Sequence, residues 1–131
     1  MKVLLTGAGG FLGWHTRLRL HAQGEHEVRV VTRESWGDLG ALVADTDAII
    51  HVAGVNRGDD SDVEAGNVRL AHDVVNAVIA ASRPVRVVYA NSIQAGNGTA
   101  YGTGKEQAAT VLRGLEETGS VVVDVRLPNI F

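Results

Sequence analysis

Lys2–Gly13, KVLLTGAGGFLG, is the stretch of sequence that decides the fold. Residues 3–5 form a continuous apolar run that ends at Thr6, and such a run is typical of a parallel strand buried on both faces. A glycine-rich turn follows, and a helix with apolar surface is predicted over about residues 10–22. The stretch therefore predicts a buried strand, a sharp turn and a helix, in that order.

Three glycines, Gly7, Gly10 and Gly13, lie three residues apart in this turn. In a strand–turn–helix unit, one glycine permits the tight turn, one lets a pyrophosphate approach the backbone, and one lets the helix pack close to the strand. The unpaired N–H groups and the positive dipole end of the helix then receive the phosphates. We therefore expect a dinucleotide site here. The alternative is an ordinary strand–turn–helix corner without a ligand.

Composition narrows the classes of function. The chain has 131 residues, 45% of them hydrophobic and 21% charged, which is typical of one globular domain with a core. Its net charge is −3 and its basic residues are scattered singly, so we expect no nucleic-acid surface. No apolar run approaches the roughly 18 residues of a membrane span. The absence of cysteine excludes disulfides and thiol chemistry, which is consistent with a cytoplasmic protein.

The five histidines show no paired spacing of the kind that metal sites use, so we expect no metal. Only His51, at the end of an apolar run, is expected near a ligand.

Strand and helix patterns alternate along the rest of the chain. Strands are predicted at residues 27–32, 47–52, 85–90 and 121–127, and helices at residues 35–44, 63–81 and 101–118. This alternation predicts an α/β fold: a doubly wound parallel sheet, Rossmann-like, of about six strands with helices on both faces. We expect residues 1–131 to form one dinucleotide-binding domain.

The end of the second predicted strand bears on the choice of cofactor. Arg33 comes about 20 residues after Gly13, where an arginine can pair with the 2′-phosphate of NADP and an acidic residue would bind the ribose of NAD. We therefore predict NADP. The alternative is NAD, with Arg33 solvated and Glu34 on the ribose. At the end of the third strand, the small residues Ala53 and Gly54 stand where backbone must pass close to a ligand.

Tyr101 and Lys105 are four residues apart at a predicted helix start, so they share one face. A nearby ammonium and a helix N-terminus both favour a phenolate, which makes Tyr101 a candidate general acid/base. Ser92, near the end of the preceding strand, is placed to polarise a carbonyl oxygen. We predict that these three residues are catalytic. The alternative is that Tyr101 and Lys105 are only a surface pair.

The glycine loop resembles the TGxxGFxG loop of the extended short-chain dehydrogenase/reductases, a family of nucleotide-sugar epimerases, dehydratases and reductases. A narrower resemblance covers most of the chain. It is to the reductase domain of capsular-polysaccharide enzymes that reduce a UDP-4-keto-6-deoxy amino sugar. It rests on the runs HVAGVNR (51–57), GNV (66–68), NSIQA (91–95), AYGTGK (100–105) and RLPNIF (126–131).

This resemblance implies roles for further residues. Phe11 and Leu12 of the glycine loop would contact the cofactor, as would Pro128, which would lie beside the nicotinamide. Asn129 would contact the nucleotide sugar together with Ser92.

Two residues depart from the family pattern. Asn91 stands where a serine is usual, and Gly104 replaces the serine of Y-G-x-S-K. A glycine there should loosen the helix by about 1 kcal/mol relative to alanine. Asn67 resembles the asparagine of the family's N-V motif, with a structural cap or a surface role as the alternative.

The resemblance implies reduction of the C4 ketone of a nucleotide sugar by NADPH, in surface polysaccharide synthesis. Ile93 and Gln94 follow Ser92 where 4,6-dehydratases have an Asp–Glu pair, which disfavours dehydration. One alternative is a nucleotide-sugar 4-epimerase that uses NAD. Another is an NADP-binding module without turnover, because the substrate-binding domain is expected to be missing. We expect the N-terminal part of a longer enzyme, which is a homodimer when full length.

Overall fold

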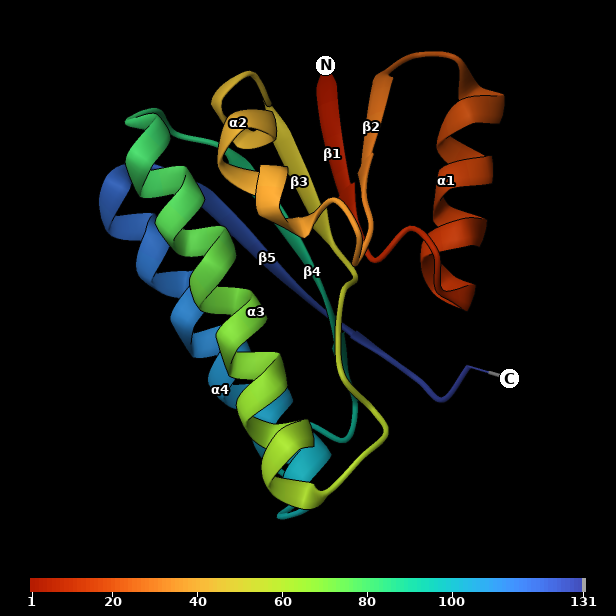
Figure 1. The fold of residues 1–131 in the computed structure, drawn as a ribbon, viewed down its shortest axis with the longest axis vertical. Coiled ribbons are helices and arrows are strands. Elements are labelled where there is room, and N and C mark those ends of the chain that lie inside the picture. Colours follow the sequence, from red (N-terminus) through yellow and green to blue (C-terminus); the bar gives the residue numbers. More distant parts are fainter. Residues whose placement is uncertain (131) are drawn as a thin grey trace.

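The computed structural model describes residues 1–130, and Phe131 lies outside the described residues. Its centre is a parallel sheet of five strands in the order β2-β1-β3-β4-β5 (Figure 1). The strands are β1 (Lys2–Thr6), β2 (Glu27–Val31), β3 (Ala48–His51), β4 (Arg86–Ser92) and β5 (Val121–Leu127). The predicted α/β fold with a Rossmann-like parallel sheet is confirmed.

The expected count of about six strands is wrong for residues 1–130. The five apolar runs identified in the sequence supply the five strands, and no further segment pairs with this sheet. The long connection between β2 and β3 is a turn, a short 3-10 helix (Trp36–Asp38) and α2 (Leu39–Ala44), so it adds no strand.

Helices cover both faces of the sheet, as predicted. The path from β1 to β2 runs one way across the sheet, and the path from β2 through β3 and β4 to β5 runs back the other way. Right-handed crossovers therefore place α1 (Phe11–Gln23) on one face, and α2, α3 (Asp60–Ala81) and α4 (Ala100–Arg113) on the other (Figure 1). None of the helices in residues 1–130 has the length and apolar character needed to cross a membrane.

The main core lies between the sheet and α2, α3 and α4. Leu4, Ile49 and Val87 from three neighbouring strands are fully buried against helix residues such as Val74 and Leu112. Removing this apolar surface from water is the main favourable contribution to folding.

The opposite face is covered less completely in residues 1–130. The register of β5 with β4 places Val122 on the core side, so Val121, Val123 and Val125 point to the face that carries α1. These three valines are exposed, because α1 lies over β1 and β2 at the other end of the sheet. The valine-rich strand β5 is therefore buried on one face only.

His51 lies inside the core with its side chain buried, and its expected place near a ligand stays a prediction. It is 1% exposed, and its ring stacks on Tyr89 with the ring centroids 5.5 Å apart. Burial, helped by the positive charge of Lys105, lowers the pKa of His51 to about 3. The imidazole is therefore neutral in the folded protein at physiological pH.

This neutral histidine predicts a loss of stability in mild acid. The unfolded imidazole, with a pKa near 6.5, binds a proton that the folded one binds only near pH 3. We therefore expect the free energy of unfolding to fall by up to about 1.4 kcal/mol per pH unit as pH decreases from 6.5 towards 4.5. Urea denaturation at several pH values measures this slope. It should be smaller in His51→Gln and unchanged in the control His72→Gln, which alters an exposed histidine. Equal slopes in parent and His51→Gln would contradict the assignment.

Candidate cofactor and active site

The carboxyl ends of all five parallel strands lie at one edge of the sheet (Figure 1). At this edge the direction of the crossovers reverses between β1 and β3, and such a switch point is where open α/β sheets bind ligands. Gly7 follows β1 and Ala53 comes two residues after the end of β3, so the glycine loop lies at the switch point.

Different steric constraints explain why glycine stands at each position of the loop. Gly7 has φ +70°, and a Cβ on it would lie 2.6 Å from the backbone nitrogen of Ala53. A Cβ on Gly13 would collide with the carbonyl oxygen of Gly7, so Gly13 lets α1 pack against the turn. A Cβ on Gly10 would meet only the carbonyl oxygen of Gly7, at an ordinary 3.6 Å. The turn and the close packing are therefore assigned to Gly7 and Gly13, and Gly10 leaves space above the loop.

The N-terminus of α1 suits a diphosphate. Its N-cap is Gly10, and within the described residues it has neither a side-chain cap nor an acidic residue in its first turn. Phe11 and Leu12 are the first residues of the helix, so their backbone N–H groups belong to the unpaired first turn. The partial positive charge of such a helix end attracts phosphate groups. The residues present therefore fit a dinucleotide cofactor.

Thr6 fixes the opposite wall of this loop, a role that the sequence did not reveal. Its Oγ1 accepts hydrogen bonds from the backbone N–H groups of Val52 and Ala53, each at 3.1 Å. The same hydroxyl lies 2.8 Å from Nδ1 of His51, and its own proton is free to be donated to that neutral ring. Thr6 thus holds Ala53 against Gly7. The only sequence signal was a polar residue at the end of a buried apolar strand.

Asn67 acts as a clamp on the loop that follows β3. It is buried, its Nδ2 donates to the carbonyl of Val55 at 2.7 Å, and its Oδ1 accepts from the N–H of Val55 at 3.1 Å. A Cβ on Gly54 would lie 3.0 Å from this Oδ1, so the glycine permits the close approach. Asn67 is therefore neither a helix cap nor a surface residue, but a buried residue of α3 that holds this loop.

Arg33 and Glu34 are both exposed just beyond β2, at the same edge. A bond to its own backbone N–H, a bond from the Thr32 hydroxyl and the charge of Arg33 lower the pKa of Glu34. Arg33 takes part in none of the ion pairs found within residues 1–130. The edge therefore presents an exposed cation followed by an exposed carboxylate.

Ser92 is the last residue of β4 and is buried, and its Oγ accepts a hydrogen bond from the N–H of Gln94 at 3.1 Å. Tyr101 is the second residue of α4, whose N-cap Thr99 accepts from the N–H of Gly102. Burial raises the pKa of Tyr101, and the neighbouring Ser92 hydroxyl opposes that rise. The expectation that the site favours a phenolate is therefore wrong for this structure: the phenol is protonated at neutral pH.

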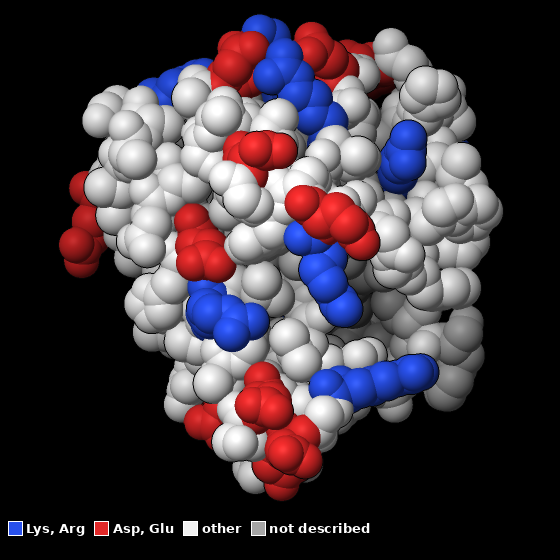
Figure 2. Space-filling model, in the orientation of Figure 1, with Lys and Arg blue, Asp and Glu red and all other residues white. Residues whose placement is uncertain are grey.

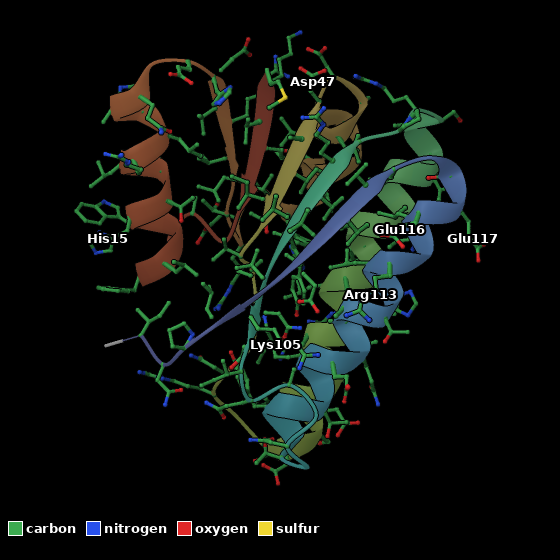
Figure 3. The ribbon with its side chains drawn as sticks, turned by 180° about the vertical axis from the view of Figure 1, so that it is seen from behind. His15, Asp47, Lys105, Arg113, Glu116 and Glu117 are labelled. Carbon is green, nitrogen blue, oxygen red and sulfur yellow. The ribbon has the colours of Figure 1, made fainter. Side chains whose placement is uncertain are left out.

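Lys105 is buried at the start of α4, only 4% exposed, which excludes the surface-pair alternative (Figure 3). Its Nζ donates to the carbonyl oxygen of Ala90 at 2.6 Å and lies 4.2 Å from the centroid of the Tyr89 ring. Burial lowers the pKa of Lys105 to about 8, and the negative charge of Asp124 acts in the opposite direction. The ammonium is thus held by β4 at Ala90, two residues before Ser92.

Helix packing explains the glycine at position 104. A Cβ on Gly104 would lie 2.9 Å from Cα of Glu64, so its absence lets α4 approach α3 closely. The propensity cost expected from the sequence is therefore accompanied by a packing contact that it did not reveal, since alanine would force the two helices apart.

Pro128 and Asn129 follow β5 and are exposed at the same edge. Nε2 of Gln94 donates to Oδ1 of Asn129 at 3.2 Å, and the N–H of Ile93 donates to the carbonyl of Leu127 at 3.0 Å. These bonds join the loop after Ser92 to the segment after β5. They bring the residue expected to contact the nucleotide sugar beside the candidate catalytic residues.

The described residues contain no group of three or more His, Asp or Glu side chains placed to hold a metal ion. On the face seen in Figure 2, Lys and Arg side chains lie among Asp and Glu side chains. Several of these charges form exposed ion pairs, such as Lys2 with Asp45 at 2.7 Å.

The glycine loop lies at the switch point, and the N-terminus of α1 is open to phosphates. Ser92, Tyr101 and Lys105 lie at the neighbouring strand end. Together these features define a dinucleotide-binding domain of the dehydrogenase type. Residues 3–120 match the NAD dependent epimerase/dehydratase family, and the chain belongs to this family. The resemblance to the extended short-chain dehydrogenase/reductases is thereby confirmed.

Individual relatives support the narrower resemblance. The chain is 40% identical over 134 residues to UDP-2-acetamido-2,6-beta-L-arabino-hexul-4-ose reductase of Pseudomonas aeruginosa, covering all of this chain and 36% of that protein. It is similar to the capsular polysaccharide assembling protein CapF of Staphylococcus aureus, with 32% identity, a TM-score of 0.84, and coverage of 100% of this chain and 36% of that one. The chain therefore spans about a third of the length of these relatives.

A GDP-L-fucose synthetase of Naegleria fowleri bound to NADP shares the fold, with a TM-score of 0.81 and 13% identity. The similarity covers 99% of this chain and 54% of that one.

The contacts of the glycine loop predict that Gly13→Ala lowers the free energy of unfolding by about 1–3 kcal/mol, because α1 must move away from Gly7. Gly9→Ala is the matched control in the same loop, since a Cβ there would have no neighbour within 4 Å. We expect the control to change stability by less than about 0.5 kcal/mol. Urea denaturation of both variants provides the comparison, and equal effects would show that the close approach is misassigned.

Proposed function

We propose that this chain binds NADPH and forms the cofactor-binding part of an enzyme that reduces the C4 ketone of a nucleotide sugar. The observation that carries the proposal is the convergence of Ser92, Tyr101 and Lys105 on the sheet edge that also holds the glycine loop. The relative from Pseudomonas aeruginosa, named as a reductase of a UDP-linked hexul-4-ose, supports the substrate class.

The chemistry divides between the cofactor and the protein. Bound NADPH would supply the hydride that adds to the carbonyl carbon. The Ser92 hydroxyl donates a hydrogen bond to the carbonyl oxygen, and the Tyr101 phenol gives that oxygen a proton. A raised pKa suits this direction of reaction, since the phenol enters it protonated. Lys105 contributes a buried positive charge, held at the carbonyl oxygen of Ala90 two residues before Ser92, and its proposed further role is to hold the nicotinamide ribose.

The preference for NADP rests on Arg33. It is exposed just after β2, and a guanidinium there can bind a 2′-phosphate through two charge-assisted hydrogen bonds. Glu34, the next residue, is the group that NAD would use instead. An epimerase using NAD is the second candidate within the family.

A cofactor-binding module without turnover is the candidate of another class. The chain covers 36% of the reductase to which it is 40% identical, and this candidate applies to residues 1–131 taken alone. In both candidates residues 1–131 act as the dinucleotide-binding domain. In the enzyme candidate they form the N-terminal part of a longer homodimeric protein of surface polysaccharide synthesis.

The cofactor proposal predicts that Arg33→Ala weakens NADPH binding about tenfold or more while leaving NADH binding nearly unchanged, because only NADPH carries the 2′-phosphate. Fluorescence titration of both nucleotides measures this. Arg69→Ala, at an exposed position of α3, serves as the control and should bind NADPH like the parent. A parent that prefers NADH, or an Arg33→Ala variant with undiminished NADPH affinity, would contradict the choice of NADP.

The enzyme proposal predicts oxidation of NADPH in the presence of a UDP-4-keto-6-deoxy amino sugar. We expect Tyr101→Phe to lower kcat at least about 100-fold with NADPH affinity retained, because the phenol proton is lost and the ring remains. Absorbance of NADPH follows the reaction. Full activity of Tyr101→Phe would refute the proton-donor role. NADPH binding without oxidation by the parent would favour the module.

A further inference from the structure

One carboxylate links the elements that carry the candidate catalytic residues. Asp124, in the middle of β5, accepts a hydrogen bond from Nδ2 of Asn91 on Oδ1 at 2.7 Å. Its Oδ2 accepts from the Arg113 guanidinium of α4, also at 2.7 Å. Figure 3 shows Arg113 further along the same helix as Lys105. The Asp124 side chain is only 14% exposed, so it is held firmly between β4 and α4.

The Asn91 side chain connects Asp124 to Ser92. Its Oδ1 accepts the backbone N–H of Ser92 at 2.8 Å while its Nδ2 is held by Asp124. Asn91 is 3% exposed, and both ends of its amide have partners. The shorter serine that is usual at this position has one hydroxyl in place of this two-ended amide. The departure from the family pattern therefore has a specific structural consequence.

Asp124 also lies close to the lysine. It pairs in register with Tyr89, and the Lys105 ammonium lies over the Tyr89 ring. Both Asp124 and Tyr89 point to the side of the sheet that α4 covers, since Asp124 contacts Arg113 of that helix. The Asp124 carboxylate and the buried ammonium are therefore both neighbours of Tyr89 on this side of the sheet.

We propose that Asp124 is a positioning residue, which fixes Ser92 through Asn91 and holds the charged form of Lys105 in place through its own negative charge. The proposal rests on the proposed function for its catalytic meaning. Its two structural effects, on the Ser92 backbone and on the Lys105 ammonium, are measurable without cofactor or substrate.

Other ionisable groups surround Lys105, and the test must separate their effects from that of Asp124. They are His51 of β3 and Tyr89 of β4, Tyr101 four residues earlier in α4, and the guanidinium groups of Arg113 and Arg126, which lie 2.7 and 3.9 Å from Oδ2 of Asp124. His51 is neutral and the two tyrosines are protonated at neutral pH. The Asp124 charge is the one that raises the pKa of Lys105 against the lowering by burial.

The chain offers a direct probe, because it contains only two lysines, Lys2 and Lys105. Carbon-13 NMR of the lysine side chains as a function of pH therefore gives two resolvable titrations. Lys2, in its exposed ion pair with Asp45, serves as an internal reference. Hydrogen exchange of the Ser92 amide, measured on the same samples, reports the bond to Asn91.

Two variants separate the two effects. Asp124→Asn removes the charge and keeps an oxygen for Nδ2 of Asn91, so the Lys105 midpoint should move to lower pH and the Ser92 amide should stay protected. Asn91→Ala keeps the charge and removes the link, so the Ser92 amide should exchange about tenfold faster or more and the Lys105 midpoint should not move. Arg69→Gln, at an exposed position of α3, is the control, and should neither lower the midpoint nor expose the amide.

The proposal is overturned if the Lys105 midpoint is the same in Asp124→Asn as in the parent, or if Ser92 exchange is the same in Asn91→Ala as in the parent. Should either variant fail to fold, the parent alone still decides the link, since fast exchange of the Ser92 amide and of the Asn91 side-chain amide would exclude it.

With NADPH and the keto sugar, Asp124→Asn and Asn91→Ala should lower kcat on the order of tenfold, with KM for NADPH within about twofold of the parent. A change confined to KM for NADPH would contradict positioning of Ser92 and Lys105. Absent turnover in the parent would refute the enzyme proposal, while the lysine and amide measurements would still decide the role of Asp124.

Discussion

The contact between the turn after β1 and the backbone after β3 is the constraint on which the rest of the site depends. At this point the crossovers reverse direction, so two strands separate along the chain become neighbours and their exits meet. Gly7 accepts a positive φ there, and Thr6 holds Ala53 against it through two backbone hydrogen bonds. A side chain at Gly7 would collide with the backbone of Ala53. The open N-terminus of α1 depends on the same turn.

The part of the site around Ser92 depends on polar groups that are buried in the interior. His51, Tyr89 and Lys105 are stacked there, and their ionisation is governed first by removal from water. Each has a specific partner, as buried polar groups require: Thr6 for the imidazole and the Ala90 carbonyl for the ammonium. A protonated phenol and a buried cation at one strand end are the groups that reduction of a carbonyl needs.

Local patterns predicted most of the fold, and they were least informative about long-range contacts. The apolar runs identified each strand, although their count was given as about six and the sheet has five. Gly104 was interpreted from helix propensity alone, yet α3, about 40 residues earlier in the chain, explains it. His51 was expected near a ligand because it ends a strand, and its side chain points into the core. Propensity describes a residue and its neighbours, while each of these outcomes depends on a distant segment.

The sequence by itself determined the α/β class, the dinucleotide loop and the residue types at the strand ends, because hydrophobic periodicity and glycine spacing are local properties of the chain. Only the tertiary structure decided which of those residues meet. Ser92, Lys105 and Asp124 come from three elements, and the parallel pairing of β4 with β5 and the packing of α4 bring them together. The direction of the Tyr101 pKa was likewise decided by burial, which depends on the assembled neighbours and not on the spacing to Lys105.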